Sequence, residues 1–549
     1  MKFFLFALSA LLTASSLAAQ ELPQQLSAEK PKKETCTIAG TVVRFTDSAP
    51  LKSAIVELVD ADKQESKVTT VTDSNGRFQL KGLEPARYRL LVSRNSFVTQ
   101  QYGQRSPGGP GSTLGLAPGQ EMNDLLFRMI PSAVIAGRVS NEDGESLPNA
   151  EVTALREAYY EGARKLEPQA FSQTNDLGEY RLFGLGPGRY FVKVAYKLGM
   201  QTKFENNAHL RAADNSVQGY VPEYYPGSPE LFKATSVTVK AGEEVSRIDL
   251  TVRPINVFSV RGHVYNAVDK KKGVGGILGL VPRSSSIIWG RLESQRIFIQ
   301  RPDGSFEFSD VLPGSYVVAL QWQDENKTYF ARRDIEVGNA DVEGVSLTIT
   351  PGILINGHVT WDGKPALESE ELNVYLRSAV SGSSILYHEG AKVSEDGVFS
   401  LKNVWEDTYH LLTYGESADC YLKSVRYGTS DALEDGFTVQ RGTDASLEVT
   451  LSSRGARVQG TVTDADGLPV AGVWVVLVPE EAHRGQTQMY KVATTDQYGH
   501  FELRGIAPGD YKLFSWEEVE NGAWQDPEFL KPFEEKGEEV KLRKTTTKP

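Results

Sequence analysis

Apolar and polar residues alternate in short segments along this chain, and turn residues separate one segment from the next. Five of these segments are centred on a glycine, at residues 38–42, 135–139, 260–264, 355–359 and 458–462. A period of two residues predicts half-buried β-strands. Asp-Gly and Pro-Gly pairs between the segments favour tight reversals of the chain. Hardly any of the chain shows helical periodicity, so we expect strands throughout.

A second pattern, which we call the cassette, follows each opening strand. It consists of an acidic residue, a glycine, an aromatic residue and, after a turn, a tyrosine. The cassette acids are Asp73, Asp176, Asp303, Asp396 and Asp496. The glycine and the tyrosine are 12 residues apart in every copy, from Gly76 and Tyr88 to Gly499 and Tyr511. A spacing that repeats in this way predicts an array of similar modules.

We therefore predict an all-β fold, a tandem array of about five antiparallel β-sandwich modules. The predicted boundaries are a signal peptide at 1–19, a linker at 20–34, and modules at 35–131, 132–254, 255–352, 353–454 and 455–545. The first four modules end in another alternating segment. The fifth ends in a charged stretch, residues 534–544, for which we expect one short strand and a frayed tail.

The opening Gly-x-Val strand, the Asp-x-x-Gly-x-Phe hairpin and the Leu-x-Pro-Gly-x-Tyr turn together resemble the carboxypeptidase regulatory-like domain. The resemblance covers nearly all of residues 35–545. It implies a transthyretin-like (prealbumin-like), carbohydrate-binding-like β-sandwich, similar to the B-type stalk domains of Gram-positive surface adhesins. Such stalk domains often carry an isopeptide cross-link assisted by a glutamate after the tyrosine. That glutamate is missing here, so the resemblance implies no cross-link.

The beginning of the chain has the pattern of a secretory signal. Lys2 precedes a short apolar run, and small residues at 16–19 suit cleavage after Ala18 or Ala19. No later stretch is apolar for long enough to span a membrane. We therefore expect an exported protein, periplasmic or extracellular. The net charge of −12 argues against a nucleic-acid partner, which would require a basic surface.

The chain has two cysteines, Cys36 before the first module and Cys420 in the fourth. In an oxidising compartment they can form a disulfide, provided that the two backbones approach each other. Otherwise they remain unpaired thiols in separate modules. The sequence leaves both alternatives open.

Residues with catalytic chemistry are scattered. The seven histidines form no His-Glu-x-x-His pattern, and no Gly-x-Ser-x-Gly elbow or phosphate loop is present. His263 and His358 share one repeat position that is Thr or Arg in the other modules, which is typical of an exposed strand. The cassette acids can bind calcium, but turn capping by aspartate accounts for them with fewer ligands. We predict no enzymatic activity, no metal and no cofactor, unless a site is assembled between modules.

Two insertions rich in Tyr and Pro, residues 101–111 and 220–229, occupy equivalent places in the first two modules. Loops on a rigid sandwich commonly carry recognition. The candidate ligand-binding residues are Tyr102, Tyr220, Tyr224, Tyr225 and Trp524. Their rings can stack on sugars or anchor a protein partner, or they can pack on their own sheets.

These features predict an exported, non-enzymatic rod of modules that binds or spaces. One version binds polysaccharide through the loop aromatics. The alternative is an envelope protein–protein scaffold or adhesion stalk with no affinity for glycans. The aromatic residues of the loops are where these two versions differ.

Overall fold

The computed structural model describes residues 35–61, 67–160, 162–196, 210–211, 217–268, 274–283, 287, 294–299, 303–324, 327–369, 371–379 and 390–543. The predicted signal peptide and linker, residues 1–34, lie outside this part of the chain. More than half of the described residues lie in strands, and the α-helix among them, α1 (Pro527–Leu530), has 4 residues. The predicted all-β class is confirmed. None of the described helices is long and apolar enough to cross a membrane.

Modules 1 and 2, numbered as the predicted repeats, each contain two main sheets. The strands of module 1 are β1 (Cys36–Arg44), β2 (Ile55–Asp60), β3 (Lys67–Val71), β4 (Arg77–Leu83), β5 (Arg87–Ser93), β6 (Gln100–Gln101), β7 (Leu114–Gly115) and β8 (Glu121–Met129). Those of module 2 are β9 (Ala133–Ser140), β10 (Glu151–Tyr160), β11 (Ala163–Gln173), β12 (Glu179–Leu185), β13 (Gly188–Ala195), β14 (Leu210–Arg211), β15 (Val217–Tyr220), β16 (Glu223–Tyr224), β17 (Val237–Val239), β18 (Glu244–Val245) and β19 (Leu250–Thr251), with the short helix η1 (Leu231–Lys233). The strand orders are β4-β1-β8 and β3-β2-β5-β6 in module 1, and β12-β9-β18 and β11-β10-β13-β16 in module 2.

Modules 3 and 4 follow the same plan with two differences. The strand β20 (Pro254–Asn256), which pairs with β15, leads into module 3, which contains β21 (Phe258–Asn266), β22 (Ile277–Pro282), β23 (Gln295–Phe298), β24 (Ser305–Val311), β25 (Gly314–Asp324), β26 (Lys327–Val337) and β27 (Val342–Pro351). Module 4 contains β28 (Ile353–Asp362), β29 (Asn373–Ser378), β30 (Ala391–Lys392), β31 (Val398–Val404), β32 (Thr408–Tyr414), β33 (Tyr421–Tyr427), β34 (Ser430–Asp431), β35 (Phe437–Thr438) and β36 (Leu447–Ser452). In module 3, pairing of β26 with β27 joins all seven strands into one sheet, and in module 4 β33 and β34 extend the sheet that holds β28.

In the described chain, module 5 has fewer strands than the other modules, and short helices precede its last strand. Its elements are β37 (Ala456–Thr461), β38 (Trp474–Pro479), η3 (Glu481–His483), η4 (Thr487–Met489), β39 (Lys491–Thr494), β40 (His500–Ile506), β41 (Gly509–Trp516), η5 (Ala523–Gln525), α1, η6 (Lys531–Lys536) and β42 (Glu538–Leu542). The sheets have the orders β37-β40 and β39-β38-β41-β42. The short strand expected in the charged C-terminal stretch is β42, and it pairs with β41.

The opening strand of modules 1 to 4 lies between the first cassette strand, which runs antiparallel to it, and a closing strand, which runs parallel to it. The glycine at its centre lets the cassette aromatic and the closing strand approach closely. A Cβ on Gly40 would collide with the carbonyl oxygen of Leu125, and a Cβ on Gly357 would collide with the ring of Phe399. The repeated opening glycine is therefore a packing requirement.

The constant spacing of the cassette also has a local cause. The turn glycine has φ between 71° and 86° in all five copies, in the left-handed region that favours glycine. The cassette tyrosine then donates its hydroxyl to the backbone carbonyl four residues earlier, at 2.7–3.1 Å. These tyrosines are Tyr88, Tyr190, Tyr316, Tyr409 and Tyr511. In module 4, which lacks the Pro-Gly turn, the acceptor is the carbonyl of Trp405.

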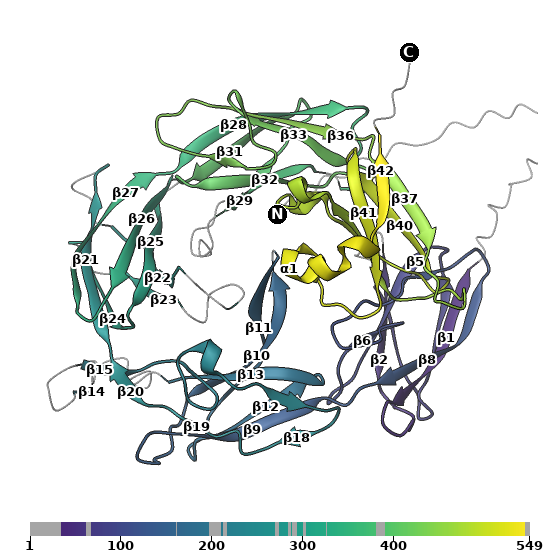
Figure 1. The fold of residues 1–549 in the computed structure, drawn as a ribbon, viewed down its shortest axis with the longest axis horizontal. Coiled ribbons are helices and arrows are strands. Elements are labelled where there is room, and N and C mark those ends of the chain that lie inside the picture. The colour runs from purple at the N-terminus through teal and green to yellow at the C-terminus, as the bar shows by residue number, and fades with distance from the viewer. Residues whose placement is uncertain are drawn as a thin grey trace, which may run out of the picture.

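The five modules follow one another round a closed ring, and module 5 (yellow) lies beside module 1 (purple) (Figure 1). Gln497 of module 5 accepts a hydrogen bond from the amide of Gly115 at 3.1 Å and donates one to its carbonyl oxygen at 3.0 Å. A parallel bridge also joins Thr113 to Asp496. The predicted array of modules therefore closes on itself, a geometry that the sequence had left open.

Candidate functional site

The Tyr-Pro insertion of module 1 contacts module 5. The guanidinium of Arg105 forms an ion pair with Glu517 at 3.1 Å and donates to the carbonyl of Ala471 at 3.5 Å. Gly472 packs against the carbonyl of Gly103, where a Cβ would stand only 2.6 Å from that oxygen. The insertion, which we predicted to carry recognition, therefore binds another part of the same chain and helps to close the ring.

Tyr102, in the same insertion, is half-buried on the core of its own module. Its ring meets Phe127 edge-on, with centroids 5.7 Å apart. Burial raises the pKa of the Tyr102 hydroxyl. The structure therefore favours the packing alternative for this residue.

The Tyr-Pro insertion of module 2 is also packed inward. Tyr224 is 4% exposed, and the ammonium of Lys193 lies 5.8 Å from its ring centroid. Tyr220 contacts Tyr196 edge-on at 5.2 Å, and Tyr225 is partly buried against the module 2 core. Of these three candidate residues, Tyr224 is thus removed from solvent, and the other two are partly buried against the module 2 core.

Trp524 is 2% exposed, so our interpretation of it as a surface residue is wrong. Its ring meets that of Trp474 on β38 at 5.4 Å, in a core cluster that also contains Leu530. Next to this cluster, Phe529 contacts Tyr159 of module 2 at 6.2 Å. The C-terminal helical segment of module 5 therefore joins module 5 to the hairpin of β10 and β11 across the ring (Figure 1).

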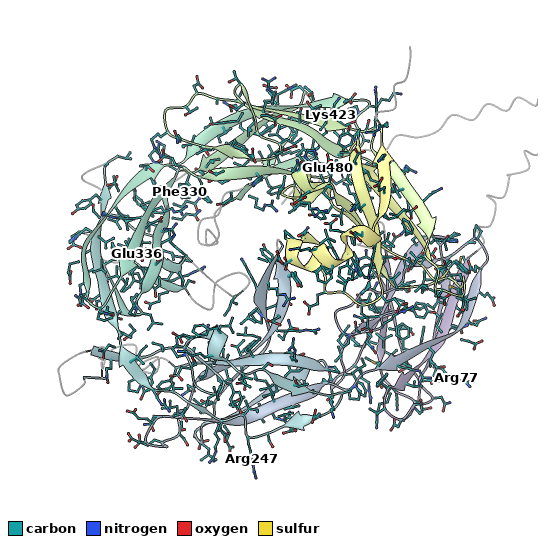
Figure 2. The ribbon with its side chains drawn as sticks, in the orientation of Figure 1. Arg77, Arg247, Phe330, Glu336, Lys423 and Glu480 are labelled. Atoms are coloured by element: carbon teal, nitrogen blue, oxygen red, sulfur yellow. The ribbon has the colours of Figure 1, made fainter. Side chains whose placement is uncertain are left out.

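The junctions between consecutive modules combine aromatic contacts with ion pairs. Phe330 lies where modules 3 and 4 meet, 5.3 Å from the ring of Trp405 (Figure 2). At the junction of modules 4 and 5, Asp419 accepts hydrogen bonds from Arg504 at 2.6 Å and from Arg457 at 2.7 Å. These bonds, first from Arg504 and then from Arg457, lower the pKa of Asp419 to about 2.

Cys36 and Cys420 do not pair. Both thiols are buried and free, one in the core of module 1 and one in module 4. The thiol of Cys36 donates to the carbonyl of Ala117 at 3.1 Å. The disulfide alternative is therefore not realised, because the two cysteines lie in separate modules.

Two of the cassette acids, Asp73 and Asp496, cap their own turns with two backbone bonds each. The Asp73 carboxylate accepts two backbone N–H bonds at 2.8 Å each, and Asp496 accepts two at 2.8 and 2.9 Å. In module 2 the residue that does this is Asn175, so our assignment of the capping role to Asp176 is wrong. No group of three or more metal-ligating side chains occurs among the described residues.

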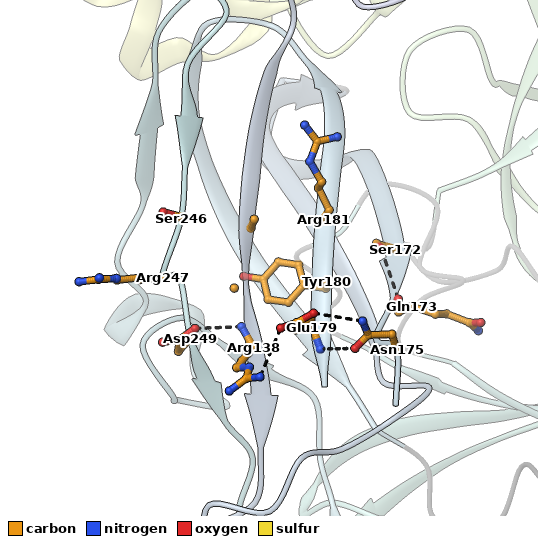
Figure 3. Close-up of a pocket in the computed structure, with 12 residues that line it drawn as sticks. Arg138, Ser172, Gln173, Asn175, Glu179, Tyr180, Arg181, Ser246, Arg247 and Asp249 are labelled. Atoms are coloured by element: carbon orange, nitrogen blue, oxygen red, sulfur yellow. Dashed lines mark hydrogen bonds and ion pairs between the residues drawn. The ribbon is translucent and has the colours of Figure 1, made fainter. Parts of the chain in front are cut away.

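An open groove of 610 Å³ crosses module 2 over β9, β12 and the closing segment (Figure 3). Arg138 donates to Glu179 at 3.2 Å, and Arg181 donates to Glu244 at 3.0 Å, so these charges are already paired. Arg247 has φ 63° and separates β18 from β19. Figure 2 shows its side chain at the outer rim of the ring. The groove is lined by polar and charged side chains, several of which bond to one another.

Comparison with known proteins identifies the modules. Residues 37–123, 134–253 and 457–516 match the Carboxypeptidase regulatory-like domain. These matches fall in modules 1, 2 and 5. Modules 1, 2 and 5 therefore contain carboxypeptidase regulatory-like domains, as the motifs predicted. No curated protein matches the chain.

Several solved structures align with parts of the chain at low similarity. The Bacillus anthracis TIE protein is 12% identical, with a TM-score of 0.16 over 58% of this chain and 50% of that one, so the chain spans half its length. The Streptococcal ancillary pilin is 10% identical, with a TM-score of 0.19 over 58% of this chain and 100% of that one. The minor pilin of Streptococcus agalactiae is 13% identical, with a TM-score of 0.21 over 40% of this chain and 96% of that one.

Proposed function

We propose that this protein is an exported, non-enzymatic scaffold of the cell envelope, which holds five β-sandwich modules in a ring and binds protein partners. The observation that carries the proposal is the closure of the ring by contacts between modules 1 and 5. The Tyr-Pro insertion of module 1 and the helical segment of module 5 also contact other modules of the ring. Such contacts make the ring one platform, on which surfaces of different modules keep fixed positions.

A variant in which the contacts between modules 1 and 5 are removed tests this function. Arg105→Ala combined with Gln497→Ala removes the ion pair to Glu517 and both bonds to Gly115. We expect the double variant to have a larger radius of gyration in small-angle X-ray scattering, with each module still folded. The matched control is Ser74→Ala, because Ser74 is exposed and takes the place of Gln497 in the module 1 turn.

Partner recovery is the functional readout. After mild cross-linking in the native envelope, the wild type and Ser74→Ala should both be recovered with the same protein partner. The opened ring should recover at least fivefold less, since a partner that spans modules loses their fixed spacing. Repeated recovery of the wild type without any partner would contradict the scaffold function.

One observation supports glycan binding as a second candidate function. Phe232, in η1 directly after the module 2 insertion, is 81% exposed. An exposed ring of this kind suits stacking on a sugar face. If the protein binds glycans, we expect it to be retained on insoluble polysaccharides and on a glycan array. Phe232→Ala should abolish this retention. The control Phe45→Ala, a change at another exposed ring, should preserve it. Absence of retention by the wild type would remove it.

A further inference from the structure

Within the described residues, module 5 has no closing strand like those of the other modules. In modules 1 to 4, the parallel partners of the opening strands are β8, β18 with β19, β27 and β36. The opening strand of module 5, β37, has β40 as its single strand partner in the described chain. The last strand, β42, extends the opposite sheet beside β41 instead. One edge of β37 is therefore open.

The open edge leaves part of the module 5 core uncovered. In modules 1 to 4, the two inward residues flanking the opening glycine are 0–3% exposed; they are Ile38, Val42, Ile135, Val139, Val260, Val264, Ile355 and Val359. Their equivalents in module 5, Val458 and Val462, remain partly exposed. The cassette aromatic is 2–5% exposed in modules 1 to 4, but Phe501 is also partly exposed.

The space beside the opening glycine confirms that nothing from the described chain covers this edge. In modules 1 to 3, a Cβ on the glycine would collide with a carbonyl oxygen of the closing strand. On Gly460, the three nearest heavy atoms would all belong to the Phe501 ring, the third of them 3.9 Å away. Within the described chain, no other segment therefore takes the position that a closing strand has in modules 1 to 3.

The backbone of β37 offers hydrogen-bonding groups along this edge. The amide of Val462 donates toward β40, to the carbonyl of Gly499 at 2.9 Å. Because successive residues of a strand point to opposite sides, the amides of Arg457, Gln459 and Thr461 face the open edge. In module 1 the residue equivalent to Arg457 is Thr37, whose amide donates to a carbonyl just before β8 at 3.1 Å. Open strand edges of this kind accept a further strand.

We propose that the open edge of β37 binds an extended segment of a partner protein, which lies parallel to β37 and completes the module 5 sandwich. The four closing strands of the chain define the required side chains. Each has apolar residues at three alternating positions, namely Leu125, Phe127 and Met129; Ile248, Leu250 and Val252; Val345, Leu347 and Ile349; and Leu447, Val449 and Leu451. The inference names a partner class for the scaffold and rests on that proposed function.

Charge adds a second requirement. A strand parallel to β37 would end beside the turn that contains Asp464 and Asp466, both exposed. In module 1 the closing strand has Arg128 near its end, and this side chain donates to Ser48 in the corresponding turn at 3.0 Å. A basic residue near the C-terminal end of the partner segment would thus meet two carboxylates. Acidic residues also outnumber basic ones across module 5.

The segment is assigned to a different protein rather than to a second copy of this chain. Every closing strand of the described chain is already paired in its own module. A second copy could lend one of them only by unfolding that module. A partner with a free extended segment has no such cost.

The test uses the full chain and a nine-residue peptide with the sequence of β8, labelled with a fluorophore. It supplies the three alternating apolar residues and Arg128. We expect saturable binding by fluorescence anisotropy and slower hydrogen exchange at the amides of Arg457, Gln459 and Thr461. A peptide of the same composition, reordered to break the alternation, is the control and should bind at least tenfold more weakly.

Gln459→Pro makes the test specific for this edge. Proline removes the outward amide of residue 459 and no hydrogen bond to β40. It should weaken peptide binding at least tenfold, whereas Gln459→Ala should bind like the wild type. The inference is overturned if the β8 peptide does not bind the wild type, or if it binds Gln459→Pro equally well.

Three further outcomes separate this inference from others. Self-association of the chain that Gln459→Pro abolishes would make a second copy the occupant and overturn the assignment to a partner. If the peptide does not bind but native co-purification persists, only the open-edge inference falls. If the peptide binds but no native partner is ever recovered, the scaffold function falls instead.

Discussion

Modules 1, 2 and 5 build the cassette turn differently from modules 3 and 4, although all five keep the same glycine and tyrosine. In the first group, the residue three positions before the glycine accepts two backbone N–H bonds through its side chain; it is Asp73, Asn175 or Asp496. A buried threonine precedes it in each case, and these residues are Thr72, Thr174 and Thr495. Their hydroxyls accept hydrogen bonds, at 2.8–3.1 Å, from the backbone amides of the residues directly before β2, β10 and β38.

Module 4 replaces both residues. Val393 stands in place of the threonine, and Ser394 in place of the capping acid, with its hydroxyl bonded to Asp396. In module 3, the acid next to the glycine, Asp303, accepts from the amide of Ser305 at 3.0 Å. The family match covers modules 1, 2 and 5, the group with the Thr–Asp/Asn pair. The pair thus occurs in the three modules that match the family, whereas the glycine and the tyrosine occur in all five.

The largest effect should come from a feature that both groups share, the opening glycine. Gly40→Ala in module 1 and Gly357→Ala in module 4 each place a Cβ against atoms that cannot move freely. We expect each to destabilise its module by about 3 kcal/mol, since overpacking a core costs up to that amount. Denaturant unfolding followed by module-resolved hydrogen exchange measures it. Unequal losses in the two modules would show that the glycine has different roles in the two groups.

Thr174→Val should produce a smaller effect, confined to the first group. It leaves the amide of Ala150 and the carbonyl of Leu147 without their hydroxyl partner in the core. We expect a loss of about 2 kcal/mol for module 2, since each buried group left unpaired costs about 1–3 kcal/mol. The reciprocal change, Val393→Thr in module 4, is the matched control and should not raise stability. A gain there would mean that module 4 still has the neighbouring groups that the threonine needs.

The smallest effect concerns the junction between the two groups, where Asp419 of module 4 binds Arg457 and Arg504 of module 5. The pKa of Asp419, about 2 in the folded chain, lies below its ordinary value of about 3.9. The stabilisation is therefore fully present above about pH 4 and is lost as the pH falls toward 2. Exchange at this junction should rise over that interval in the wild type. Asp419→Asn should exchange faster at pH 7 and change little with acid; an unchanged wild-type profile would contradict this assignment.

The module architecture could be predicted because its causes are local. The glycine–tyrosine spacing reflects a turn and a hydrogen bond over four residues, both visible in the sequence. The missing closing strand of module 5 was visible too, as a charged stretch in place of an alternating one. The sequence also shows a threonine directly before the capping residue in modules 1, 2 and 5, but we did not predict its role. These residues are Thr72, Thr174 and Thr495.

The ring and the fate of the loop aromatics could not be predicted in the same way. Gly115 and Gln497, which help to close the ring, are 382 residues apart, and no periodic pattern marks such a pair. Trp524 lies among Gly and polar residues, so its local sequence suggested exposure, but a strand fifty residues earlier provides Trp474 as its partner. Contacts between distant segments decide these cases, and the composition of one segment does not report them.

Closure of the ring also changes how such an array comes apart. In a linear repeat protein, the two end modules have one neighbour each, so opening begins there and spreads inward. Here module 1 and module 5 support each other through Gln497 and Arg105, so the array has no end module from which fraying can start. The order of the modules in the sequence therefore does not determine the order in which they unfold. Unfolding of the array begins at the weakest junction instead of at an end module.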